Sequence, residues 1–162
     1  MKKILYICNN PETEYEEIKS LLDLGYKVFS IGEQLQIRPD SERYIRELID
    51  PKLNNLFWKH HPNYRYGGLI GLNHLFIEEF DLFIVSDYIE HLSLNWKNLS
   101  ARKKSVIWVW RKPARIMPKL KPIIANYISK GLKVLDNPGG KTKFSKPIEK
   151  DVWEKTIVDL TK

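Results

Sequence analysis

Short apolar runs alternate along this chain with longer stretches in which apolar residues recur every three or four positions. The runs predict strands, and they lie at residues 3–8, 26–31, 82–85, 106–110 and 132–135. Apolar runs without polar alternation are typical of strands that are covered on both faces in a parallel sheet. We therefore expect an α/β fold: a doubly wound, mostly parallel Rossmann-like sheet of about five strands with helices on both faces.

The stretches between these runs predict helices. The first helix is expected to begin with Thr13 as its cap, with Glu16 completing a capping box, and to end before Gly25. The other helical patterns cover residues 44–53 with a break at Pro51, 53–58, 72–80, 89–99, 117–128 and 151–160. Residues 60–68 are dense in aromatic, basic and turn residues and predict a loop. No internal repeat interrupts the pattern, so residues 1–162 are expected to form a single domain.

The third apolar run breaks off abruptly into Ser86, Asp87 and Tyr88. In open α/β sheets, ligands bind outside the carboxyl ends of the strands. Asp87 could therefore take a proton from a substrate hydroxyl as a general base. An aspartate in this position could equally cap the helix that follows. The sequence leaves both roles open.

Polar side chains also follow the other predicted strands. They are Asn9 and Asn10 after the first strand, Glu33 after the second, and Arg111 and Lys112 after the fourth. Together with Ser86, Asp87 and Tyr88, they are expected to converge on one cleft. Arg111 could hold a phosphate or carboxylate in bidentate fashion.

His60 and His61 are adjacent, so their side chains are expected to diverge, and no carboxylate stands at ligand spacing beside them. We therefore expect no metal site. Either histidine could line the cleft, or both could pack on Trp58 or Tyr64.

Several signatures of cofactor chemistry are missing from the sequence. The turn after the first strand is Asn-Asn-Pro-Glu-Thr, without glycine, so it matches neither a dinucleotide fingerprint nor a Walker loop. No Gly-x-Ser-x-Gly elbow occurs, and the single cysteine, Cys8, lies in a predicted buried strand. We expect no tightly bound cofactor and no internal disulfide. A single cysteine makes a reducing, cytoplasmic location the default expectation.

The composition, 43% hydrophobic and 29% charged residues, is that of a globular domain, and no apolar window is long enough to span a membrane. The charge is uneven: residues 1–96 hold 10 Lys and Arg against 15 Asp and Glu, whereas residues 97–162 hold 17 against 5. The basic half, with Arg102, Lys103 and Lys104, indicates either an anionic partner such as nucleic acid or a solvated lysine-rich surface.

The order of the elements resembles the N-terminal, acceptor-binding domain of GT-B glycosyltransferases. A first strand with its helix is followed by Leu-Gly-Tyr-Lys-Val-Phe at 24–29, then by Phe-Asp-Leu-Phe-Ile-Val at 80–85. A basic strand at 106–111 and Lys-Gly-Leu-Lys-Val-Leu at 130–135 complete the resemblance, which covers nearly the whole chain.

The resemblance implies a protein that binds a sugar acceptor and uses a nucleotide sugar as co-substrate. In this family the C-terminal domain binds the donor, and inverting members often place a base on an N-domain loop. That base would correspond to Asp87 or to one of His60 and His61. The printed chain ends at Lys162, where a donor domain would begin, so we expect a separate donor-binding chain or a homo-oligomer.

Three functional hypotheses follow from the sequence. The first is a glycosyltransferase-like acceptor-binding half, whose own catalytic activity the sequence leaves undecided. The alternative is a non-catalytic nucleic-acid- or nucleotide-binding module that uses the basic C-terminal half. A protein-interaction subunit would instead show an apolar surface patch near Trp153 or Leu160.

Overall fold

A computed structural model describes residues 2–9, 11–32, 51–64, 69–111, 120–136 and 148–162. Within them, five strands form one sheet in which every neighbouring pair is parallel. The strands are β1 (Lys3–Cys8), β2 (Lys27–Gly32), β3 (Leu82–Ser86), β4 (Ser105–Trp110) and β5 (Lys133–Asp136). The predicted doubly wound α/β class is confirmed.

The strand order is β2-β1-β3-β4-β5, so the chain reverses direction across the sheet at β1. It first moves outward from β1 to β2, and then returns to place β3 on the other side of β1. The close pairing of β1 with β2 requires a glycine at its end. Gly32 has a φ of 141°, and a Cβ there would lie 2.4 Å from the carbonyl oxygen of Cys8.

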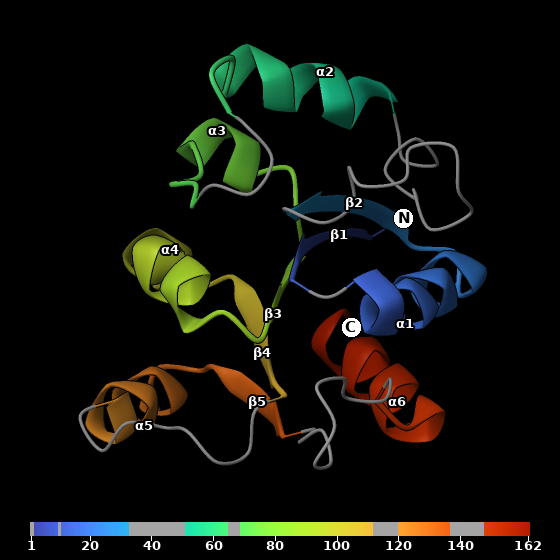
Figure 1. Ribbon diagram of the computed structural model, residues 1–162, viewed down its shortest axis with the longest axis vertical. Coiled ribbons are helices and arrows are strands. Elements are labelled where there is room, and N and C mark those ends of the chain that lie inside the picture. The colour runs from blue at the N-terminus through green and yellow to red at the C-terminus, as the bar shows by residue number, and fades with distance from the viewer. Residues whose placement is uncertain (1, 10, 33–50, 65–68, 112–119, 137–147) are drawn as a thin grey trace.

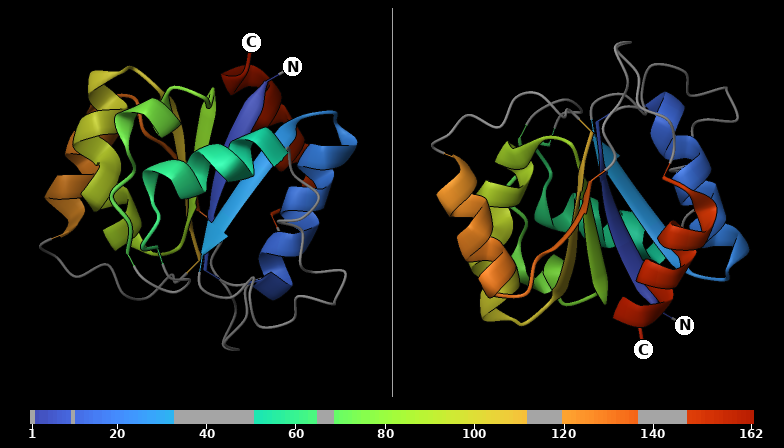
Figure 2. Two further views of the ribbon diagram at one scale, coloured as in Figure 1. Left: turned by 90° about the horizontal axis from the view of Figure 1, so that it is seen from above. Right: turned by 90° about the horizontal axis from the view of Figure 1, so that it is seen from below.

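Helices cover both faces of the sheet (Figures 1 and 2). On one face lie α1 (Pro11–Asp23) and α6 (Lys150–Leu160). On the other lie α2 (Pro51–His60), α3 (His74–Ile77), α4 (Ile89–Ala101) and α5 (Lys121–Ser129). Each face holds its own buried apolar cluster, to which the strands contribute alternate side chains. Burial on both faces explains why the strand sequences show no polar alternation.

Three predicted boundaries around α1 and α2 are wrong, and proline accounts for two of them. The first helix begins at Pro11, so Thr13 lies inside it and does not cap it. Pro51 begins α2 instead of breaking a helix. Proline suits the first helical position because its missing N–H would have no intrahelical partner there. The third error is His60, which ends α2 and does not lie in a loop. The predicted helix at 44–50 lies outside the described residues.

The 72–80 pattern predicts a long helix, but α3 covers only His74–Ile77. The side chain of Asn95, on α4, binds the backbone just before it. Its side chain accepts a hydrogen bond from the Leu72 N–H at 2.8 Å and donates one to the Ile70 carbonyl at 3.0 Å. These bonds hold residues 70–72 outside the helix. The helix then begins after Asn73, whose side chain caps it. A long-range side chain thus overrides the local helical pattern.

Candidate functional site

The carboxyl ends of β1 and β3 bring Asn9 and Asp87 together. Asn9 Nδ2 donates a hydrogen bond to Asp87 Oδ2 at 3.1 Å, across 78 residues of sequence. Both side chains are half-buried. Because β1 and β3 are the strands between which the order reverses, the pair lies at the topological switch point, where open α/β sheets bind their ligands.

Two hydrogen bonds to the neighbouring strand β4 hold the backbone of Asp87. Its φ is 63°, a left-handed conformation that aspartate adopts more readily than most residues. Its N–H donates to the Val109 carbonyl at 2.7 Å, and its carbonyl accepts from Trp108 Nε1 at 3.2 Å. The residue that caps α4 is Tyr88, without a side-chain capping bond. The helix-cap alternative for Asp87 is therefore wrong, because the residue lies one position too early.

Ser86 and Tyr88, on either side of Asp87, face different surroundings. Ser86 is fully buried, and its hydroxyl lies in the interior. Tyr88 is 44% exposed, and its ring contacts His91 with centroids 5.9 Å apart. The strand ends at Ser86, and the left-handed backbone of Asp87 separates the two residues, so Tyr88 does not follow Ser86 into the interior.

Arg111 follows the last residue of β4, and its side chain is buried. Its Nε donates to Ser86 Oγ at 2.9 Å, and one of its terminal nitrogens donates to Glu17 Oε1 at 2.5 Å and to the Tyr6 hydroxyl at 3.1 Å. Its other terminal nitrogen, Nη1, has no hydrogen-bond partner among the described residues. Burial lowers the pKa of Arg111, but Tyr6 and Glu17 raise it by a larger amount. The net shift is upward, so the guanidinium stays charged. Arg111 thus joins β3, β1 and α1.

Glu17 is the carboxylate that balances Arg111. Its Oε1 also accepts from the Tyr6 hydroxyl, and its Oε2 accepts from the Ile148 N–H at 2.9 Å. Burial, and then Glu17, raises the pKa of Tyr6 well above its ordinary value, so this hydroxyl remains a neutral donor. Cys8 on the same strand is buried, and burial raises the pKa of its thiol. These are the properties of an unreactive cysteine.

Glu14 is a site residue that the sequence reasoning missed. Its side chain is completely buried, and each of its two carboxylate oxygens lies 2.7 Å from the backbone nitrogen of Asn9. Burial raises its pKa to about 7, against the opposing effects of Arg111 and of hydrogen bonds from Asn9 and Ser86. A signal was present: Glu14 and Glu17 occupy the same helical face as Ile18 and Leu21, which form the apolar stripe of α1.

The two histidines are not brought into this network. The ring of His61 packs on Phe57 and Phe76 at centroid distances of 5.0 and 5.8 Å, and its Nε2 accepts from the Asn73 N–H at 3.3 Å. Burial lowers the pKa of His61, and His60 lowers it further. His61 therefore packs on aromatic rings, but these are Phe57 and Phe76 and not the expected Trp58 or Tyr64. No group of three potential metal ligands occurs in the described part of the chain.

Asn10, Glu33 and Lys112, the remaining predicted site residues, lie outside the described residues. Trp110, which ends β4, stacks on Trp108 with ring centroids 5.8 Å apart and planes 9° from parallel. It is half-buried and packs against the core on the α4–α5 face.

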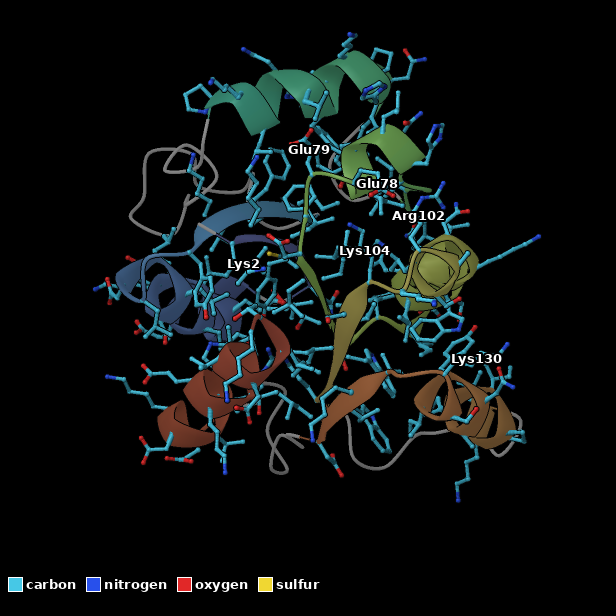
Figure 3. The ribbon with its side chains drawn as sticks, turned by 180° about the vertical axis from the view of Figure 1, so that it is seen from behind. Lys2, Glu78, Glu79, Arg102, Lys104 and Lys130 are labelled. Atoms are coloured by element: carbon cyan, nitrogen blue, oxygen red, sulfur yellow. The ribbon has the colours of Figure 1, made fainter. Side chains whose placement is uncertain are left out.

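The basic triplet 102–104 lies at the opposite edge of the sheet, where the strands begin. Arg102 Nε lies 3.1 Å from Glu78 Oε1, and Lys104 Nζ lies 3.5 Å from Glu78 Oε2. Figure 3 shows both cations beside this glutamate. Lys104 also donates to the Phe80 carbonyl at 3.1 Å. Two of the three charges in the triplet are therefore engaged within the protein.

Trp153 does not form a surface patch, because it is 1% exposed and packs inside the α1–α6 layer. A groove of about 460 Å³ runs between these helices, and most of its lining residues are charged or polar. No helix among the described residues is long and apolar enough to cross a membrane.

No family model matches the sequence, and no curated protein does so either. The candidate site therefore stands on its own geometry.

Proposed function

We propose that this protein binds a hydroxyl-bearing small molecule, such as a sugar, in a crevice that the fold rule places at the carboxyl ends of β1 and β3. The role is that of the acceptor-binding half of a glycosyltransferase. The observation that supports it is the Asn9–Asp87 pair, a carboxylate oriented by an amide at the switch point of the sheet.

A carboxylate suits an acceptor hydroxyl because it accepts a strong, charge-assisted hydrogen bond. Asp87 is held by contacts from β1 and β4, so its backbone does not have to be ordered when the ligand binds. Such preorganisation reduces the entropic cost of binding. The amide of Asn9 occupies Oδ2 and thereby orients the carboxylate plane.

The proposed chemistry is transfer of a glycosyl group from a nucleotide sugar. The acceptor oxygen forms a bond to the anomeric carbon, the bond from that carbon to the nucleoside diphosphate breaks, and the diphosphate leaves with the electron pair. Asp87 takes the proton of the acceptor hydroxyl as general base. The nucleotide sugar would be held by a second domain, a partner chain or another copy of this chain.

A matched pair of aspartates tests this proposal. Asp81 and Asp87 stand at opposite ends of β3, and Asp81 accepts a hydrogen bond from the Lys3 N–H at the amino edge. We would titrate the wild-type chain with monosaccharides, nucleosides and UDP-glucose, and follow the backbone amide resonances. Asp87→Asn is expected to weaken binding by about tenfold or more, the loss of one hydrogen bond to a charged group. Asp81→Asn should bind as the wild type does.

Two results would overturn the proposal. One is that no member of the panel shifts the resonances of Asn9 or Asp87. The other is that Asp81→Asn and Asp87→Asn weaken binding equally, since the effect would then be indirect.

The nucleic-acid alternative remains a prediction with less support. Arg102 and Lys104, two of its three expected contacts, both pair with Glu78. It predicts an affinity for DNA or RNA that falls steeply with salt and that drops when residues 102–104 become alanine.

A further inference from the structure

Glu14 connects the interior of the protein to the proposed crevice. Its carboxylate faces the backbone N–H of Asn9 with both oxygens, and the side chain of the same asparagine donates to Asp87. The three residues come from α1, from the end of β1 and from the end of β3. Asn9 therefore bonds to a buried carboxylate through its backbone and to a half-buried carboxylate through its side chain.

The groups packed around Glu14 favour opposite protonation states. Arg111 at the end of β4, the Ser86 hydroxyl on β3 and the Asn9 N–H favour the carboxylate. Complete burial and Glu17, on its own helix, favour the neutral acid. Tyr6 and Cys8, on β1, both have raised pKa values, so they stay uncharged near neutral pH. These effects leave Glu14 close to balance at neutral pH.

We infer that Glu14 is a positioning residue for the crevice: as a carboxylate it holds Asn9 against Asp87, and a proton on it weakens that hold. This inference rests on the proposed function only in assigning the crevice to a ligand. Ligand binding at the Asn9–Asp87 pair is then coupled to one buried proton. Affinity is greater above neutral pH, where Asn9 is bound to a charged acceptor.

A purely structural role would give Glu14 the same contacts. A glutamate that reaches back to the N–H before a helix stabilises the start of that helix, as in a capping box. Such a role predicts that loss of the side chain destabilises α1. It does not predict that the Asn9 amide resonance titrates with pH. Nor does it predict that Glu14→Gln abolishes such a titration while the fold stays intact.

The experiment follows the Asn9 backbone amide by NMR between pH 5 and pH 9, without ligand. In the wild type its proton resonance should shift with a midpoint of about 7, the raised pKa of Glu14. Its exchange protection should fall by about fivefold on the acid side, because a charged acceptor binds an N–H more strongly than a neutral one. In Glu14→Gln both changes should disappear. Glu16→Gln, an exposed site on the same helix, should titrate as the wild type does.

A measurement on the wild type covers the case in which Glu14→Gln does not fold. With glutamate labelled at the side-chain carboxyl carbon, one carboxyl resonance should titrate with the same midpoint as the Asn9 amide. The inference is overturned if the Asn9 amide shows no titration near pH 7 in the wild type. It is equally overturned if the shift persists in folded Glu14→Gln, since another group would then be its source.

A second arm measures affinity for whichever panel member binds. The wild type should bind more tightly at pH 8 than at pH 6, and Glu14→Gln should bind equally at both values. The amide titration needs no ligand, so it can succeed even if the proposed acceptor role fails. A ligand that binds with equal affinity at both pH values in the wild type would overturn the coupling and leave the proposed function standing.

Discussion

Arg111 and Glu17 form an ion pair inside the protein, with side chains that are 4% and 1% exposed. The pair joins the end of β4 to α1, and the segment before α6 is also attached, because the Ile148 N–H donates to the other oxygen of Glu17. Arginine is suited to such a position because its donors reach several acceptors in fixed directions. Here they reach Glu17, Tyr6 and Ser86.

Replacing Arg111 by methionine should destabilise the fold strongly. The substitution leaves the carboxylate of Glu17 buried without its cation, which typically costs about 3–5 kcal/mol. Urea unfolding at pH 7 measures the loss. The control is Arg102→Met, which removes a partly exposed pair with Glu78 and should cost about 1 kcal/mol or less. Equal losses in the two variants would contradict a buried role for Arg111.

The Glu14 carboxyl should make stability depend on pH between about 4.5 and 7. Its pKa is raised from 4.5 to about 7 on folding, so in this window the folded state binds a proton that the unfolded state has released. The contribution of this group is therefore complete below pH 4.5 and is lost as the pH rises to 7, by about 3 kcal/mol at most. Urea unfolding at pH 5 and pH 8 should show the loss in the wild type. If Glu14→Gln shows the same difference in unfolding free energy between pH 5 and pH 8, another group is responsible for the pH dependence.

Gly32→Ala should be more damaging than Gly25→Ala. Both glycines have a positive φ, 141° and 92°, so both substitutions introduce backbone strain of about 1 kcal/mol. A Cβ on Gly25 meets nothing within 4 Å, whereas one on Gly32 would lie 2.4 Å from the Cys8 carbonyl oxygen and force β1 and β2 apart. Thermal unfolding should rank the wild type, Gly25→Ala and Gly32→Ala in that order. Equal melting temperatures for the two variants would mean that β2 can shift without cost.

The backbone of Asp87 should discriminate between small and β-branched replacements. At a φ of 63°, glycine is accommodated without steric strain, whereas valine clashes with its own backbone at a cost of about 1–3 kcal/mol. Asp87→Gly should therefore be more stable than Asp87→Val by chemical denaturation. Neither variant should bind the proposed ligand. The reverse order of stability would show that this turn relaxes to another conformation.

Much of the fold could be predicted because it depends on local pattern. Strand β1, Lys3–Cys8, has the predicted bounds. Strand β3 extends one residue beyond the predicted run at 82–85, to Ser86. Apolar runs of this kind have one stable environment, the middle layer of a covered sheet. Helix starts are harder to predict, because proline can either break a helix or begin one, and Pro11 and Pro51 both begin helices.

The candidate site was predicted in part. Ser86, Asp87 and Arg111 follow from the rule that strand ends meet at one edge, and the structure places them there. The rule does not say which way a side chain turns, so the inward direction of Ser86 and Arg111 could not be predicted. Glu14 could have been suspected from its place in an apolar stripe, but a helical wheel does not identify the partner of a buried charge.

The sequence by itself determined the class of this protein: five apolar strands, the helices between them, and a polar segment after β3. These properties depend on short segments, in which the spacing of apolar residues directly reflects which positions are buried. Tertiary structure alone decided that Asn9 bonds to Asp87, that Glu14 lies behind them, and that Arg111 belongs to the interior. The reason is physical. A hydrogen bond or a shifted pKa depends on distances of a few ångströms between residues far apart in the chain, and only the packed sheet sets those distances.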